Sequence, residues 1–142
     1  MRVLYFSRDY TPHDRRFLSA ITGAGLQAYF LRLERLSRQT EDRALPDGVE
    51  LLHWESGGTA PFRWIDLPGR VLGLRRIIRA VEPDVIHAGP LQTCAYIATL
   101  ANPPAAAPLV SMSWGSDLLV DAFKNGWMRN TTRFVLRRSD WL

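Results

Sequence analysis

Two short segments combine an apolar, strand-like stretch with polar residues that could contact a ligand. Residues 83–90 carry His87 and Gly89 near their end, and residues 108–119 change abruptly from an apolar stretch into Trp-Gly-Ser-Asp. In an open α/β sheet, ligands bind at the carboxyl ends of the strands. We therefore predict that both segments form one rim of a binding cleft, with the His87 imidazole directed into it. The alternatives are a satisfied strand-end histidine and a glycine that only shapes a turn.

The turn at residues 114–117 offers several ways to contact a ligand. Gly115 permits a positive φ or a close approach of the backbone. Ser116 and Asp117 can cap the helix that follows, or they can face a sugar or phosphate together with the N–H groups of the turn. Trp114 has a flat apolar face that suits a sugar ring, although a tryptophan in the core or at a domain interface fits the sequence equally well.

A third polar group follows the first apolar run. Arg8, Asp9 and Tyr10 come directly after residues 2–7, so they would lie at the carboxyl end of a central strand. We predict substrate contacts for all three, with an ordinary polar loop as the alternative. Gly57 and Gly58, after a later apolar run, are a weaker candidate.

The elements that must position these residues alternate along the chain. Continuous apolar runs predict buried strands, and an apolar stripe at helical spacing predicts an amphipathic helix over residues 70–81. The predicted strands are residues 2–7, 26–33, 49–54, 85–88 and 109–113, and the other predicted helices are residues 15–22, capped by Asp14, 91–101, 120–124 and a last one from residue 131 or 132. This order predicts an α/β fold with a doubly wound parallel sheet.

Composition predicts one soluble domain over residues 1–142. The chain is 46% apolar and 23% charged, which is ordinary for a globular protein. No apolar run has the length of a membrane span, and the first run is too short for a signal peptide, so we expect a cytoplasmic protein. The lone Cys94 predicts a buried, reduced thiol.

The charge balance allows several partners. The net charge is +4, and Lys124 is the only lysine among 18 basic residues. Phosphate-bearing ligands, anionic membranes or nucleic acid would suit such a charge, as would a plain solvated face. Because the basic residues are scattered and no recognition motif appears, we expect no nucleic-acid partner.

Several familiar chemistries lack their motifs. The first strand is not followed by a Gly-x-Gly-x-x-Gly turn, and no P-loop is present. No His or Cys cluster has metal-ligand spacing, and the Gly-x-Ser-x-Gly elbow of hydrolases is missing. The sequence therefore assigns no metal site and no catalytic residue to this chain.

Taken in order, these motifs resemble the N-terminal domain of family 4 glycosyltransferases, the retaining enzymes of the GT-B class. The matching segments span nearly the whole chain and are residues 1–7 with the proline-containing loop that follows, Pro83-Asp84-Val85-Ile86-His87-Ala88, Gly115-Ser116-Asp117 and Arg137-Arg138-Ser139-Asp140. The resemblance implies two Rossmann-like domains that face each other across a cleft. The N-terminal domain mainly holds the acceptor, and the C-terminal domain mainly holds the nucleotide-sugar donor and carries a paired-glutamate motif.

The resemblance also implies what this chain does within a larger enzyme. It would be the acceptor-side half, truncated before the donor-binding domain and inactive alone, since residues 140–142 look like the start of another strand. The enzyme would transfer a hexose from a nucleotide-sugar donor, with retention and without a metal or cofactor, to a glycan or lipid-linked acceptor in polysaccharide biosynthesis. We expect an exposed apolar patch where the second domain docks.

The chain departs from the family pattern at two places. Many members have a Gly-Gly pair after the first strand that approaches the donor phosphate, whereas residues 10–16 contain no glycine. Many members also place histidine before the Gly-x-Asp turn, where it contacts the sugar, whereas this chain has Trp114. An indole nitrogen only donates a hydrogen bond, so it cannot replace an imidazole as a proton acceptor.

Some family members act at the inner face of a membrane, and this chain has residues that could dock there. Interfacial proteins pair basic residues with aromatic ones. A solvated helix face is the alternative. The candidate docking residues are Phe62, Arg63, Trp64, Arg70, Arg75, Arg76 and Arg79.

A different class of function also fits an α/β sheet, namely a non-catalytic flavodoxin-like or receiver-like module that binds a partner or small ligand. A receiver would need clustered acids at the ends of the first and third strands and a lysine after the fifth. Here the fifth strand ends in Trp-Gly-Ser-Asp, and Asp9 is the only acid directly at the end of the first. These residues favour glycosyl transfer over a phosphate-accepting receiver.

Overall fold

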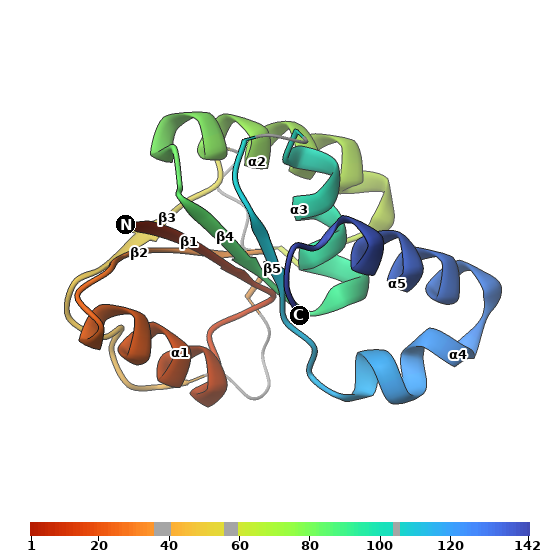
Figure 1. The fold of residues 1–142 in the computed structure, drawn as a ribbon, viewed down its shortest axis with the longest axis horizontal. Coiled ribbons are helices and arrows are strands. Elements are labelled where there is room, and N and C mark those ends of the chain that lie inside the picture. The colour runs from red at the N-terminus through yellow and green to blue at the C-terminus, as the bar shows by residue number, and fades with distance from the viewer. Residues whose placement is uncertain (36–40, 56–59, 104–105) are drawn as a thin grey trace.

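The computed structural model describes residues 1–35, 41–55, 60–103 and 106–142, so Gly57 and Gly58 lie outside the described residues. It contains a five-stranded sheet in the order β3-β2-β1-β4-β5 (Figure 1). All neighbouring strands are parallel, which confirms the predicted α/β class. The strands are β1 (Arg2–Ser7), β2 (Gln27–Arg32), β3 (Val49–Leu52), β4 (Val85–Ala88) and β5 (Leu109–Ser111).

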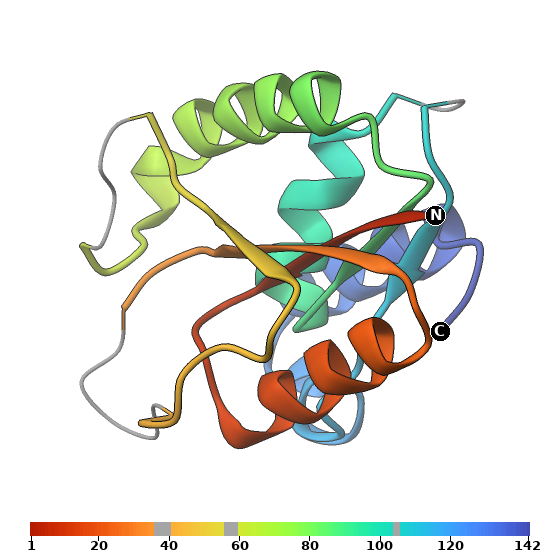
Figure 2. The ribbon, with the colours of Figure 1, turned by 90° about the vertical axis from the view of Figure 1, so that its left-hand side faces the viewer.

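Helices cover both faces of this sheet. Helix α1 (Pro12–Gly23) lies on one face, while α2 (Leu67–Val81), α3 (Tyr96–Ala101) and α5 (Gly126–Arg138) lie on the other (Figures 1 and 2). The predicted doubly wound arrangement is therefore confirmed. None of the described helices combines the length and the apolar character needed to cross a bilayer.

The central strand β1 supplies both halves of the core. Successive side chains of a strand point to opposite faces, so Leu4 and Phe6 join the cluster beneath α2 and α3, while Tyr5 joins Leu18 of α1 and Phe30 of β2 on the other face. All side chains from Val3 to Ser7 are buried. This continuous burial explains why β1 reads as an unbroken apolar run rather than an alternating one.

Helix α1 begins three residues earlier than predicted, because Thr11 rather than Asp14 is its N-cap. The Thr11 hydroxyl accepts a hydrogen bond from the backbone N–H of Asp14, and the Asp14 carboxylate accepts one from the backbone N–H of Thr11 at 2.8 Å. This reciprocal pair is a capping box. Pro12 occupies the first helical position, where its missing N–H costs nothing.

The last helix also begins earlier than predicted. Asn125 and Gly126 interrupt the chain as expected, but the Asn125 side chain accepts a hydrogen bond from the N–H of Met128 at 2.9 Å and so starts α5 at once. The preceding helical segment is longer than predicted and consists of the π-helical turn η3 (Asp117–Asp121) and the short helix α4 (Ala122–Lys124). Helix α2 likewise starts at Leu67, after the 3₁₀ turn η1 (Trp64–Asp66).

The predicted helix 91–101 is present as the π-helical turn η2 (Leu91–Ala95) followed by α3. Cys94 is buried within it and forms no disulfide, as expected, and burial raises the pKa of its thiol. Beyond α5, the backbone of Trp141 forms a parallel bridge with Val110 of β5. Thus residues near position 141 do adopt the strand-like pairing that the sequence predicts.

Candidate functional site

A cavity of about 870 Å³ lies at the carboxyl ends of β1, β4 and β5. Strand order reverses between β1 and β4, because β2 and β3 extend the sheet to one side and β5 to the other. Ligands of open α/β sheets bind in the crevice at such a switch point. The lining residues are Ser7, Arg8, Asp9, Thr11, Pro12, His13, Pro90, Gln92, Thr93, Trp114, Ser116, Asp117, Asp121, Lys124 and Met128.

At the end of β1, Arg8 and Asp9 each have fixed protein partners. The Arg8 guanidinium is half exposed and is paired with the carboxylate of buried Glu34, whose second oxygen accepts a hydrogen bond from the N–H of Phe62 at 2.5 Å. Asp9 is buried and accepts a hydrogen bond from the N–H of Tyr10 at 2.7 Å. The cavity therefore presents a positioned guanidinium, whereas the Asp9 carboxylate is almost fully buried in its wall.

At the end of β5, the Asp117 carboxylate connects two loops. One of its oxygens accepts hydrogen bonds from the Ser113 hydroxyl at 2.7 Å and the N–H of Trp114 at 2.9 Å, and the other accepts one from the N–H of Leu91 at 3.0 Å. Asp117 therefore does not cap the helix that follows it, which was one interpretation of the sequence; its carboxylate instead binds the first residue of η2 and the turn after β5. Ser116 is exposed, and its side chain caps no helix.

Gln92 is a cavity residue that the sequence analysis missed. Its side-chain amide donates hydrogen bonds to the backbone oxygen of Asp117 at 2.6 Å and to the Thr132 hydroxyl at 2.8 Å. The Thr132 hydroxyl in turn donates to the backbone oxygen of Met128. This network fixes the turn after β5 against α5. The available signal was a lone amide in an otherwise small and apolar helical segment.

His13 is a second missed residue. It lies in the first turn of α1, and its ring meets the Trp114 ring edge-on, with centroids 5.2 Å apart. The Trp114 indole nitrogen is buried and has no hydrogen-bond partner among the described residues. An imidazole, which can accept a proton, thus reaches the cavity from α1 and lies beside the indole at position 114.

His87 does not line this cavity, contrary to the prediction that its imidazole faces the cleft. It pairs in register with Tyr5, and its ring packs edge-on against Tyr5 at 5.1 Å and Phe17 of α1 at 5.5 Å. The reason is strand alternation, because Ile86 and Ala88 already point to the opposite face of the sheet. Burial lowers the pKa of the His87 imidazole.

Tyr10 is also absent from the lining residues. Its ring packs against Phe30 with centroids 5.7 Å apart, and its hydroxyl donates a hydrogen bond to the backbone oxygen of Ala44 at 3.0 Å. Burial raises the pKa of this phenol. Tyr10 therefore closes the core beneath α1 at a position where the sequence predicts a substrate contact.

Gly89 and Gly115 shape the cavity without lining it. A Cβ atom added to Gly89 would lie 2.5 Å from the backbone oxygen of Met112, so only glycine allows the ends of β4 and β5 to approach this closely. Gly115 has a φ of +82°, as its place in the turn predicts. The structure therefore brings together Arg8, Asp9, Trp114, Ser116 and Asp117, and leaves Tyr10, His87, Gly89 and Gly115 outside the lining.

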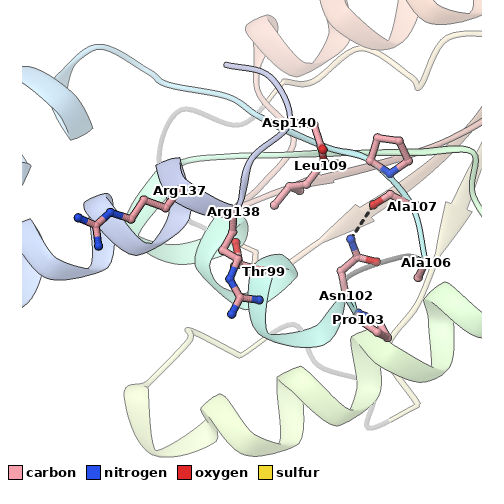
Figure 3. Close-up of a pocket in the computed structure, with 10 residues that line it drawn as sticks. Thr99, Asn102, Pro103, Ala106, Ala107, Leu109, Arg137, Arg138 and Asp140 are labelled. Atoms are coloured by element: carbon pink, nitrogen blue, oxygen red, sulfur yellow. Dashed lines mark hydrogen bonds between the residues drawn. The ribbon is translucent and has the colours of Figure 1, made fainter.

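A second cavity, of about 420 Å³, lies at the other end of the strands, among the end of α3, the start of β5 and the end of α5 (Figure 3). Its polar groups bind backbone: Asn102 donates to the oxygen of Ala107 at 2.7 Å, and Asp140 accepts from the N–H of Leu109 at 2.8 Å. Arg137 extends away from the other labelled residues. Since ligands bind at carboxyl rather than amino ends of parallel strands, we place the functional site in the larger cavity.

Three of the arginines that the sequence suggests for a basic docking face have partners within the domain. Arg70 is buried and stacks over Trp54, with its guanidinium carbon 4.8 Å from the ring centroid. Arg75 donates hydrogen bonds to the backbone oxygens of Leu100 and Ala101 at the end of α3, and Arg76 forms an ion pair with Glu55. These guanidinium groups are occupied within the domain.

Within the described ranges, no group of three His, Cys, Asp or Glu side chains could hold a metal ion.

The comparison with protein-family models accounts for nearly the whole chain. Residues 2–142 match the model described as glycosyl transferase 4-like. None of the curated proteins compared with the chain gives a significant match. The match covers far more than half of the sequence, and the parallel sheet with its cavity at the strand ends is the fold expected of a GT-B half domain. The chain therefore belongs to the glycosyltransferase 4-like family.

Proposed function

We propose that this chain is the acceptor-side domain of a retaining glycosyltransferase. The enzyme would move a sugar from a nucleotide-sugar donor to a glycan or lipid-linked acceptor. Membership of the family establishes glycosyl transfer in general. The observation that supports the finer assignment is the cavity at the switch point of the sheet, because it combines apolar ring surface with hydroxyl-binding groups.

The lining of the cavity suits a sugar. Its volume of about 870 Å³ falls in the range of small-ligand sites. The Trp114 ring lines the cavity and offers an apolar surface for the C–H face of a sugar ring. His13 can accept a hydrogen bond from a hydroxyl and Arg8 can donate one. A hydroxyl-rich acceptor therefore finds donors, acceptors and ring surface in one cavity.

The proposal assigns the reacting groups on the donor side to a second domain. The lining residues of this chain bind and orient the acceptor, and no catalytic residue is assigned to them. We expect this domain alone to bind donor weakly and to transfer no sugar. A receiver-like module is disfavoured, because Glu55 beyond β3 pairs with Arg76 rather than joining Asp9 in an acidic cluster.

The test is transfer by the full-length enzyme, supplied with a panel of nucleotide sugars and a soluble acceptor. We expect the product to keep the anomeric configuration of the donor, as read by NMR. Trp114→Ala should raise the acceptor KM roughly tenfold, because it removes the ring surface on which the sugar packs. Trp64→Ala, outside the cavity, serves as the matched control. An inverted product, or equal acceptor KM values for both variants, would contradict the proposal.

A further inference from the structure

Arg70 is a buried cation that lacks an anionic partner. It is 9% exposed, and its Nη1 atom is buried without a hydrogen-bond partner. In the described part of the chain its side chain takes part in no ion pair, and its guanidinium carbon lies over the Trp54 ring. A ring contact covers one face of a guanidinium and leaves the N–H groups in its plane to find acceptors. Since buried charges in proteins are normally paired, an acceptor is missing here.

The position of Arg70 in its helix makes the missing anion more costly. Arg70 is the fourth residue of α2, and the first turn of this helix contains no acid. The N-terminal end of a helix carries a partial positive charge, which repels a cation and attracts an anion. Asp66, at the N-cap, makes no capping hydrogen bond with its side chain and instead pairs with Arg63. Two sources of positive charge therefore coincide at the start of α2.

A cavity of about 480 Å³ borders this guanidinium. It lies between α2 and the segment after β3, which runs up to the start of the helix in Figure 2. Two further charged residues of the lining, Glu55 and Arg76, form an ion pair with each other. Gly69 also lines the cavity, and a Cβ atom added to it would have no neighbour within 4 Å. Open space therefore extends to the first turn of α2, beside the unpaired charge.

We propose that this cavity binds a small molecule through an oxyanion group, a phosphate or a carboxylate, that pairs with Arg70. Two oxygens of such a group match the N–H fork of a guanidinium, and the start of α2 favours their negative charge. The volume falls in the range of small-ligand sites. Two apolar side chains of the lining, Ile65 and Leu72, are 78% and 55% exposed. The ligand therefore combines an anionic end with an apolar body.

This site is distinct from the cavity at the strand ends. The residues found to line the two cavities do not overlap. Binding of an anion beside Arg70 is therefore independent of the proposed function, and its test needs neither a donor nor an acceptor of glycosyl transfer.

The test titrates the full chain with phenyl phosphate and with benzoate at constant ionic strength, followed by thermal unfolding and calorimetry. We expect at least one of them to raise the melting temperature progressively, because a ligand that binds only the folded state stabilises it. The tighter of the two identifies the oxyanion. Inorganic phosphate should bind at least about tenfold more weakly, because it lacks the apolar body. Benzyl alcohol, which has the ring without the charge, should give no shift.

Arg70→Met tests the guanidinium itself. Methionine keeps an unbranched side chain without the charge, so we expect the affinity for the anion to fall at least about tenfold. Without ligand, this variant should melt no lower than the unaltered chain, because replacing an unpaired buried charge by an apolar group is neutral or stabilising. Arg79→Gln is the matched control, since Arg79 is exposed on the same helix outside the cavity, and it should retain the shift. If Arg70→Met does not fold, Arg70→Gln replaces it.

Three results would overturn the proposal. The first is that neither phenyl phosphate nor benzoate stabilises the unaltered chain. The second is equal affinity in the unaltered chain and the Arg70 variant, which would place the anion elsewhere in the domain. The third is an equal loss of affinity in the Arg70 and Arg79 variants, which would show that net charge alone attracts the anion.

Discussion

At the scale of single residues, Asp117 connects the two loops that form the rim of the cavity. Its two oxygens accept hydrogen bonds from Ser113, Trp114 and Leu91, so both of the strand-end segments that the sequence singled out converge on one carboxylate. Asp117 therefore positions the site, and Trp114 beside it remains available to a ligand.

Replacing this carboxylate by an amide should loosen the rim. In Asp117→Asn, one oxygen becomes an NH₂ group that faces a backbone N–H, so a donor meets a donor. We expect the free energy of unfolding to fall by about 1–3 kcal/mol, measured by urea denaturation. Ser116→Ala is the control, because the neighbouring serine is exposed and caps no helix. Equal stability of the two variants would mean that the carboxylate does not hold the loops together.

The contact between His13 and Trp114 could not be predicted from the sequence. Trp114 cannot act as a proton acceptor, yet the His13 ring lies against it. Spatial neighbours from α1 and β5 are far apart in the sequence, so no spacing pattern reveals the pair. The capping box at Thr11 fixes the first turn of α1 and thereby fixes where His13 lies.

At the scale of elements, the strands were predictable from the sequence, whereas the starts of α1, α2 and α5 were not. Apolar runs identified β1, β2 and β4 to within a residue, because a parallel strand covered on both faces must be apolar throughout. Helices α1 and α5 began earlier because Thr11 and Asn125 supply side-chain caps. A cap depends on one rotamer, which periodicity does not encode.

The orientation of side chains was predicted less well than the elements that carry them. His87 was correctly placed in a strand, but the face it occupies depends on its neighbours in the sheet and on α1 above it. Arg70 was expected on an exposed face of its helix, but its guanidinium packs against the ring of Trp54, which follows β3, and is buried there. In both cases a residue distant in the sequence determines where the side chain lies, so the candidate site was predicted only in part.

The ends of β4 and β5 approach closely because Gly89 has no side chain. In Gly89→Ala the new Cβ would lie 2.5 Å from the backbone oxygen of Met112. Moving a backbone segment away costs more free energy than moving the end of a flexible side chain. We expect a loss of about 1–3 kcal/mol in unfolding free energy. Gly69→Ala, in α2 with nothing within 4 Å of its added Cβ, should be neutral or raise stability by up to about 1 kcal/mol. The comparison is made by thermal and urea unfolding, and a neutral Gly89→Ala would refute the close approach.

At the scale of the whole molecule, the half-buried imidazole of His87 links folding to pH. Burial lowers the pKa of His87 below its usual 6.5, so at mildly acidic pH the unfolded chain binds a proton that the folded chain does not. Stability therefore falls as the pH drops through 6.5 and below. We expect His87→Phe, which keeps an aromatic ring against Tyr5 and Phe17, to lose less stability on acidification than the unaltered chain.

The matched comparison uses the histidine after β3. His53 is exposed, so His53→Phe should leave the acid dependence of unfolding unchanged. Melting temperatures across neutral and mildly acidic pH distinguish the two variants. Parallel curves for the unaltered chain and His87→Phe would show that this imidazole is not the group responsible.

The middle position of β1 has a consequence for how the chain acquires its structure during synthesis. One edge of β1 pairs with β2 soon after both leave the ribosome, but its other edge waits for β4, since Val3 pairs with Val85. Contacts this distant in sequence form slowly. Until they form, the apolar run at the start of the chain has an open hydrogen-bonding edge, which is the surface most prone to pairing with another nascent chain.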